Sequence, residues 1–125
     1  ADVHIPDEEW VAMTKKELQA GSWKVIAEAR ESGNIGIYHS NNSANTKLIN
    51  DIIAGVSIEN VIWEAPIKSQ QAWFINLLSA DVNLGNIASN EIIPLETLRL
   101  GLRGDTFFQF LPDEFQNLRI KPKVK

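Results

Sequence analysis

Charged and polar side chains follow three apolar segments of the sequence, and their types suit the binding of a metal ion and of anions. Carboxylates are the hard oxygen ligands that Mg²⁺ prefers, and guanidinium or ammonium groups bind phosphate and sulfonate. Backbone amides that follow a glycine can hold a phosphate oxygen. In chain order these groups are Glu28, Arg30, Glu31, Glu64, Lys68, Asn83, Gly85 and Asn86.

The elements that must position these groups alternate between extended and helical patterns. Extended segments are predicted near 23–29, 60–65 and 81–86, and helices are predicted over 47–55, 69–79 and 94–103 after them. A further helix over 8–20 precedes the first strand, with Pro6 in its first turn and Gly21 as a left-handed C-cap. Strands that alternate with helices predict a parallel sheet with right-handed crossovers, in one domain over residues 1–125.

The carboxyl ends of adjacent parallel strands face one crevice, so the strand-end groups could converge there. Side-chain alternation puts Glu28 and Arg30 on one face of their strand. The plainer interpretation is a surface ion pair between Arg30 and Glu31, with Glu64 doing no more than capping a helix. Three polar strand ends in succession favour a binding site over that interpretation.

Other polar groups have weaker patterns. Arg99 and Arg103 stand four residues apart, one turn of the predicted last helix, and could grip an anion together. From spacing alone an ordinary solvated face is favoured, with Glu96 pairing Arg99. A tight turn explains Gly85 as well as a phosphate site does.

Several classes of function are disfavoured by the composition and the motifs. The 125-residue chain has no cysteine and a net charge of −4, so thiolate chemistry is excluded and a general attraction to nucleic acid or anionic membranes is not expected. His4 and His39 lack metal-ligand spacing, and no Ser/His/Asp arrangement is evident. The four tryptophans, at positions 10, 23, 63 and 73, are predicted to lie in the core. No membrane-spanning run or secretory signal pattern is present, and a cytoplasmic location is expected.

Four motifs carry a specific resemblance. "EARESG", "VIWEAPIKSQQAWFI", "DVNLGNI" and "LETLRLGLRGDTF" occur in this order in the phosphosulfolactate synthase family, and the match runs from about Glu17 to Phe108. The resemblance implies an α/β fold of the (β/α)8 TIM-barrel type and the addition of sulfite to phosphoenolpyruvate, with Mg²⁺, to give (2R)-phospho-3-sulfolactate. This reaction opens coenzyme M biosynthesis in methanogens, and some bacteria make sulfolactate this way.

The resemblance also implies roles for the polar groups. The Mg²⁺ ligands would come from Glu28, Glu31 and Glu64. Catalytic roles would fall to Glu28, Arg30, Glu64 and Lys68, whose cations would offset the charge of the two anionic substrates. The remaining substrate-binding positions would be Gln70, Gln71, Asn83, Gly85, Asn86, Arg99 and Arg103.

The chain departs from the family pattern in length and in detail. A family member has about 250 residues, as is typical of the barrel, and this chain resembles strands six to eight. No lysine here matches the one that the family is thought to use for protonation. "LLSADVN" stands where relatives usually have a glycine, and the 38–46 loop is rich in asparagine. An inactive half-barrel that needs a partner, or a phosphate-binding α/β domain of other activity, is therefore the alternative, and a homo-oligomer is expected.

Overall fold

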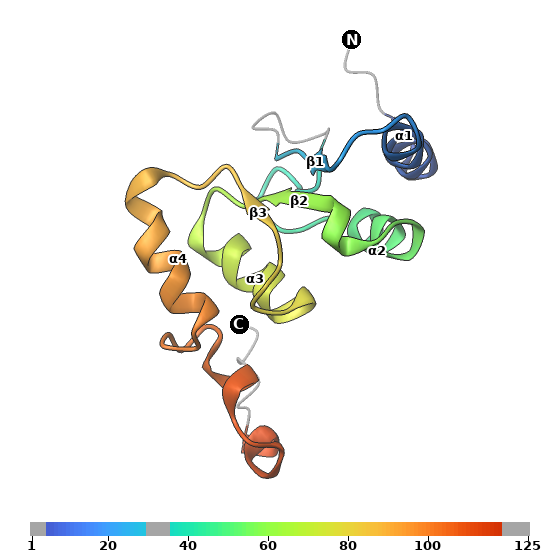
Figure 1. Ribbon diagram of the computed structural model, residues 1–125. Helices are drawn as coiled ribbons and strands as arrows, with labels where there is room; N and C mark the ends of the chain where they lie inside the picture. The colour runs from blue at the N-terminus through green and yellow to red at the C-terminus, as the bar shows by residue number, and fades with distance from the viewer. Residues whose placement is uncertain (1–4, 30–35, 119–125) are drawn as a thin grey trace.

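The structure is a computed structural model that describes residues 5–29 and 36–118. It has a three-stranded sheet, and Figure 1 shows how the helices are arranged around the short strands. Shorter 3₁₀ turns lie at 58–60, 89–91, 107–110 and 113–118. The main elements are α1 (Asp7–Gln19), β1 (Val25–Ala27), α2 (Thr46–Gly55), β2 (Val61–Glu64), α3 (Lys68–Leu78), β3 (Leu84–Gly85) and α4 (Ile92–Arg99).

The sheet has the order β1-β2-β3, and both pairs of strands are parallel. Val25 pairs with Val61, and Trp63 with Leu84. The predicted order, with a helix after each strand and one before the first, is therefore confirmed. The strands are shorter than the predicted 23–29, 60–65 and 81–86, because within the described residues β1 and β3 each pair with β2 alone, and β2 has four residues.

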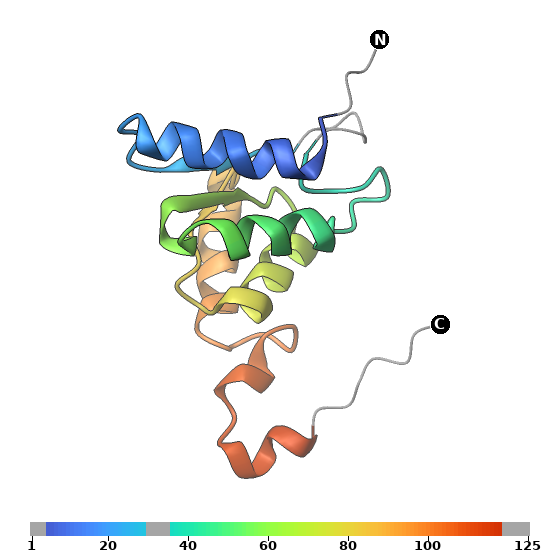
Figure 2. The same cartoon turned by 90° about the vertical axis from the view of Figure 1, so that its right-hand side faces the viewer.

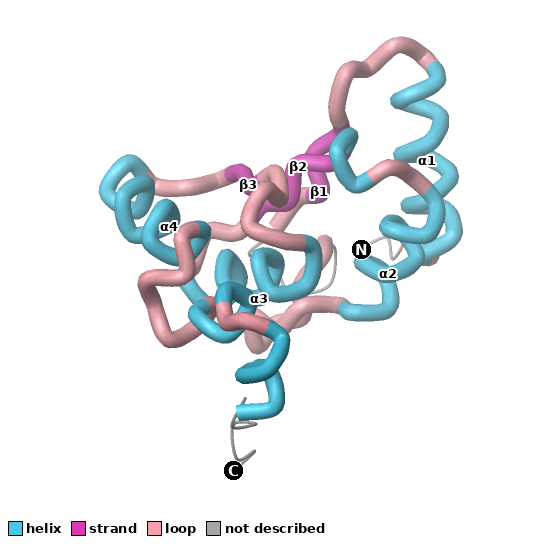
Figure 3. The backbone as a smooth tube through the Cα atoms, turned by 60° about the horizontal axis from the view of Figure 1, so that its bottom comes forward, coloured by secondary structure: helices cyan, strands magenta, loops and turns pink. Residues whose placement is uncertain are grey.

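Only one face of the sheet is covered by the described helices. Val61, Trp63 and Ala65 alternate along β2 and are at most 1% exposed, and they form the core with residues of the helices such as Phe74. Figure 3 shows α2, α3 and α4 gathered on that side of the strands. On β1, Ile26 is 61% exposed, as expected for a side chain that points to the other face.

Helix α1 packs along α2, as Figure 2 shows. The contact is close because Gly55 has no side chain: a Cβ there would lie 2.7 Å from Cγ1 of Val11. An ion pair between Lys47 and Asp7, 2.8 Å long, joins the two helices. The predicted left-handed cap at Gly21 is confirmed, with φ of 106°.

Helix α4 ends earlier than predicted, at Arg99 instead of position 103. Gly101 has φ of 69°, and the amides of Gly101 and Leu102 donate to the carbonyls of Leu98 and Thr97, which is the Schellman arrangement for ending a helix. Arg103 therefore lies beyond the helix. The prediction that Arg99 and Arg103 project from one helical face is wrong.

Ser79 adopts a backbone conformation that normally requires glycine. It follows α3 with φ of 100° and ψ of 169°. A side chain in this region costs about 1–3 kcal/mol. The strain lies in the "LLSADVN" segment, where the sequence departs from the glycine usual in the resembling family.

Ser79→Gly is expected to raise the free energy of unfolding by about 1 kcal/mol. The substitution relieves the backbone strain, but glycine has more conformational entropy in the unfolded chain, which costs roughly 0.5–1 kcal/mol. Thermal unfolding should show a Tm higher by about 4 °C. Ser57→Gly is the matched control, since Ser57 has an ordinary φ of −65° and its replacement relieves no strain. An equal or lower Tm for Ser79→Gly would contradict the expectation.

Candidate functional site at the carboxyl ends of the strands

Glu64 lies at the carboxyl end of the central strand and contacts both neighbours. Its backbone pairs with Gly85 of β3. Its carboxylate Oε2 accepts a hydrogen bond from the amide of Ala29, just after β1, at 2.7 Å. The carboxylate is therefore held at the end of the sheet by a backbone donor from the neighbouring chain segment.

Tyr38 holds the same residue from the other side. Its hydroxyl donates to the backbone carbonyl of Glu64 at 2.7 Å, and its ring packs edge-on against Phe74. Tyr38 is 8% exposed. Burial, and then the nearby charge of Glu64, raise the pKa of the Tyr38 hydroxyl well above its usual range. The sequence analysis missed this residue, although a lone tyrosine at the end of a Gly-rich stretch was a usable signal.

The raised pKa predicts a loss of stability at alkaline pH. Above about pH 10, the ordinary tyrosine pKa, the unfolded chain loses the Tyr38 proton while the folded chain keeps it. The unfolded state then binds fewer protons, so the free energy of unfolding falls as the pH rises. Tyr38 is the one tyrosine in the sequence, so tyrosinate absorbance reports on it alone. We expect no tyrosinate signal from the folded chain near pH 10, and a normal transition in denaturant. A native transition near pH 10 would show that the hydroxyl is not held as described.

Gln70 and Gln71 build the turn from β2 into α3. The Gln70 side chain accepts from the amide of Ile67 at 3.3 Å and donates to the carbonyl of Asn42 at 3.4 Å. Gln71 is fully buried, and its side chain donates to the carbonyl of Ala65 at 3.1 Å. Both side-chain amides thus form hydrogen bonds to backbone groups near the end of β2. These bonds explain why two of the polar residues after this apolar strand are glutamines.

Gly85 ends β3 beside Glu64, and Asn86 follows it. A Cβ on Gly85 would lie 2.9 Å from Cγ2 of Ile62. A side chain at position 85 would therefore clash with Ile62 of β2, and glycine avoids this clash. Asn86 has φ of 55°, a left-handed conformation that asparagine tolerates. The predicted use of the amides here as a phosphate site stays a prediction.

Lys68 forms an ion pair with Asp105, which lies beyond α4. Its ammonium is 2.8 Å from Oδ2 of Asp105, and both side chains are exposed by 40% or more. The hydrogen bond from Lys68 is the largest cause that holds the pKa of Asp105 below its usual value. Lys68 thus joins the start of α3 to the segment after α4. Among the described residues, no contact between Lys68 and Glu64 is observed.

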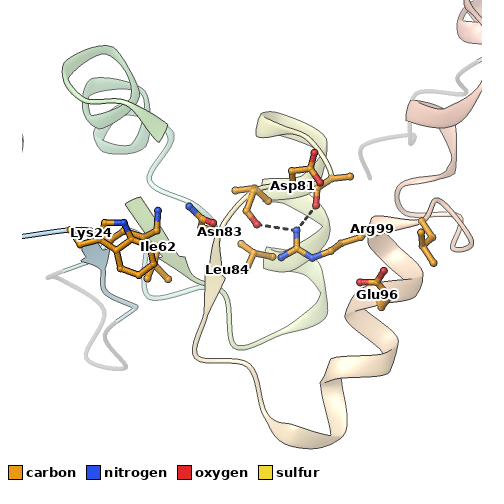
Figure 4. A pocket seen from close by; sticks show the side chains of 11 residues that line it. Lys24, Ile62, Asp81, Asn83, Leu84, Glu96 and Arg99 are labelled. Carbon is orange, nitrogen blue, oxygen red and sulfur yellow. Dashed lines mark hydrogen bonds between the residues drawn. The ribbon is translucent and has the colours of Figure 1, made fainter. Parts of the chain in front are cut away.

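Asn83 and Arg99 lie at the opposite, amino end of the sheet. Asn83 precedes β3, and its side chain donates to the carbonyl of Glu59, ahead of β2, at 3.0 Å. Arg99 donates to the carbonyls of Ala80 and Val82, and the second bond is 2.9 Å long. Figure 4 labels Arg99 and marks its hydrogen bonds with dashed lines. Both residues line a cavity of about 560 Å³ at this end. The placement of Asn83 after its strand was wrong, and Arg99 satisfies backbone carbonyls between α3 and β3.

Comparison with known proteins gives the family. The family model described as (2R)-phospho-3-sulfolactate synthase (ComA) matches residues 1–105. The chain belongs to the phosphosulfolactate synthase family. It is 47% identical over 102 residues to a phosphosulfolactate synthase of Bacillus subtilis and 48% identical over 102 residues to one of Methanothermobacter thermautotrophicus. A third, of Methanocaldococcus jannaschii, is 43% identical over 107 residues.

The matches cover most of this chain but under half of each phosphosulfolactate synthase. The first two cover 81% of the chain, and 40% and 39% of the relatives; the third covers 85% and 43%. The chain therefore spans about two fifths of the length of these relatives. The resemblance inferred from the four motifs is confirmed.

The structure describes two of the three acids that the family resemblance assigns to Mg²⁺, Glu28 and Glu64. Glu64 is half-buried at the end of β2, and Glu28, directly after β1, is exposed and accepts at its carbonyl from Ile37 at 3.3 Å. Arg30 and Glu31 lie outside the described residues. Within residues 5–29 and 36–118, no three His, Asp or Glu side chains gather as a metal site. Mg²⁺ commonly takes one or two carboxylates with waters and substrate oxygens, and Glu28 and Glu64 fit that donor set.

Two further expectations concern the rest of the chain. Trp63 is fully buried and Trp10 and Trp73 pack against the core, but Trp23 is 82% exposed, so its predicted place in the core was wrong. Trp23 comes two residues before β1 and lines the cavity at the amino end of the sheet. None of the helices in the described part of the chain is long and apolar enough to cross a membrane.

Proposed function

We propose that this chain supplies the last three β/α units of a phosphosulfolactate synthase barrel, which adds sulfite to phosphoenolpyruvate to give (2R)-phospho-3-sulfolactate. The observation that carries the proposal is Glu64, held at the carboxyl end of three parallel strands in a chain of this family. Active sites of (β/α)8 barrels lie at this end of the strands.

In the proposed reaction the sulfite sulfur forms a bond to the methylene carbon of phosphoenolpyruvate, and the electron pair of the double bond moves toward the carboxylate. A proton then adds at the α-carbon, and the phosphate ester is retained. Mg²⁺, when bound, would stabilise the charge on the carboxylate as a Lewis acid. Glu64 and Glu28 would hold the metal, and the backbone amide of Asn86, directly after the paired residue Gly85, would bind the phosphate.

The proton donor would come from the part of the barrel that this chain does not contain. No lysine of the chain matches the one implied by the family resemblance, and Lys68 is paired with Asp105. Exposed apolar residues support the need for a completing partner: Ile26 of β1 is 61% exposed, and Trp23, just before β1, is 82% exposed. Eight strands, not three, close such a barrel.

A second copy of this chain is the other candidate for the completing partner. The same exposed residues, Ile26 and Trp23, favour it. Size-exclusion chromatography separates the two candidates: a dimer would favour completion by a second copy, and a monomer completion by a different polypeptide.

NMR or crystallography with sulfate, phosphoenolpyruvate and Mg²⁺ tests the proposed site. We expect ligand-dependent changes at Glu28, Glu64 and the amides of residues 85–87, because these residues lie at the carboxyl ends of the strands or directly after them. Changes confined to Arg103, with the strand ends unaffected, would move the anion site away from the sheet and contradict the proposal.

A further inference from the structure

A second cavity lies beside the strand ends, between the 38–46 loop and the first two turns of α3. Its volume is about 540 Å³. Its walls come from the connection after β1 and the connection after β2, so it opens on the carboxyl-end side of the sheet. Neither Glu28, Glu64 nor Asn86 lines it, so it is separate from the proposed sulfite and phosphoenolpyruvate site.

The lining of this cavity carries no formal charge among the described residues, although 22% of the sequence is charged. Its polar groups are amides and hydroxyls from residues such as Asn42, Ser43, Ser69 and Gln70. No side chain here would offset the charge of a phosphate or a sulfonate. Amides and hydroxyls both donate and accept hydrogen bonds, which matches a ligand whose hydroxyl groups do the same.

The opposite wall is aromatic. Tyr38 and Trp73 line the cavity, and each packs edge-on against Phe74, with ring centroids 6.5 and 5.0 Å apart. This shared contact fixes both rings in the core. A rigid aromatic wall facing uncharged polar groups suits a ligand with an apolar ring face and polar edges.

The polar wall is also held in place before any ligand binds. The amide of His39 donates to the carbonyl of Ser43 at 2.8 Å, and the Asn41 side chain accepts from the amide of Ser43 at 3.0 Å. Asn42 has φ of 64°, and its carbonyl accepts from the side chain of Gln70. A preformed loop loses little freedom on binding, and this favours affinity. The asparagine-rich sequence of the loop, which the proposed reaction leaves unused, thus builds one wall of a cavity.

We propose that this cavity binds a small uncharged polyhydroxyl ligand of the monosaccharide class, with its ring face on Trp73 and its hydroxyls on the 41–46 loop and Ser69. None of Glu28, Glu64 and Asn86 lines the cavity, so its ligand would bind beside the proposed synthase site, although Tyr38 contacts both places and Gln70 is also a predicted substrate-binding position. Its ligand would be neutral, in contrast to the two anions of the proposed reaction.

The test is an NMR titration of this chain with glucose, ribose and methyl glucoside, and with inorganic phosphate and sulfate as the anionic rivals. We expect millimolar binding of at least one sugar, with amide shifts at 41–46 and 67–73 and smaller shifts from the anions there. Binding of phosphate or sulfate in preference to every sugar, held by the first amides of α2 and α3, would overturn the proposal. So would the absence of sugar-dependent shifts at these residues.

Two variants and a matched control sharpen the test. Trp73→Leu should weaken sugar binding by about tenfold or more, and Ser69→Ala, on the exposed first turn of α3, should weaken it a few-fold without affecting folding. Trp23→Leu is the control, because Trp23 is exposed and lines the other cavity. Equal affinities in Ser69→Ala, Trp23→Leu and the unmodified chain would place the sugar elsewhere and contradict the assignment.

Discussion

Phosphosulfolactate formation by this chain is expected to rise by at least about 10²-fold when it is mixed with the part of the Bacillus subtilis synthase that it does not match. No lysine of the chain matches the proton donor that the family resemblance implies, and a general acid typically contributes about 10²–10⁴-fold. In the proposed barrel the complementary part would also position the substrates and exclude water, so we expect the loss in the isolated chain to exceed that factor. Product formation from sulfite, phosphoenolpyruvate and Mg²⁺ is measured before and after mixing.

The matched control for this experiment is the segment of the Bacillus subtilis protein that aligns with this chain, at 47% identity. Mixed with the same complement, it should restore turnover and so show that two pieces can assemble. Turnover with that segment but none with this chain would contradict the proposed function. Robust turnover by this chain alone would instead show that it carries its own acid, and Lys68 would be the first residue to replace.

The order of the elements was predictable because its signals are local. Apolar runs of strand length, helical periodicity and the glycine at position 21 lie within a few residues of what they determine. The pairing of parallel strands then follows from the alternation of strand and helix. These expectations agree with the observed order β1-β2-β3 and with the left-handed Gly21.

The position of a residue along a strand was less predictable. The apolar run at 81–87 does not show where pairing begins, and Asn83 was placed at the wrong end for that reason. In the fold Asn83 precedes the two paired residues and bonds to the carbonyl of Glu59. This contact joins residues far apart in the sequence, and no local pattern predicts it.

Long-range contacts also decide what the cations do. The family resemblance implied that Arg99 and Lys68 bind anions, although spacing alone favoured a solvated face for Arg99. In the fold Arg99 donates to the carbonyls of Ala80 and Val82, and Lys68 pairs with Asp105. Arginine offers several donors in a fixed plane, so it can satisfy two carbonyls at once. A charged residue near a predicted site is therefore a candidate for binding only once its contacts within the protein are known.

The contrast between Glu64 and Tyr38 shows how far sequence reasoning reached into the site. Glu64 was chosen as a candidate from its place at the polar end of an apolar strand, and its role in a binding site stays a prediction. Tyr38 could not be connected with it, because the hydroxyl reaches the carbonyl of Glu64 across the connection from β1 to α2. The carboxylate was thus identified from its position in the chain, while the groups that hold it became apparent only in the fold.

Glu64→Gln in the reconstituted protein is expected to lower the rate by about 10²-fold, the effect of losing roughly 3 kcal/mol of electrostatic stabilisation. The amide oxygen of glutamine can still accept the bond from Ala29, so the fold is preserved while the negative charge is removed. The Mg²⁺ concentration for half-maximal rate should rise, because a metal ligand has been weakened. Glu96→Gln is the control, since Glu96 is an exposed carboxylate at the other end of the sheet. If both variants kept the rate and Mg²⁺ dependence of the unmodified protein, Glu64 would have a structural role alone, and the metal would have to be held by other acids.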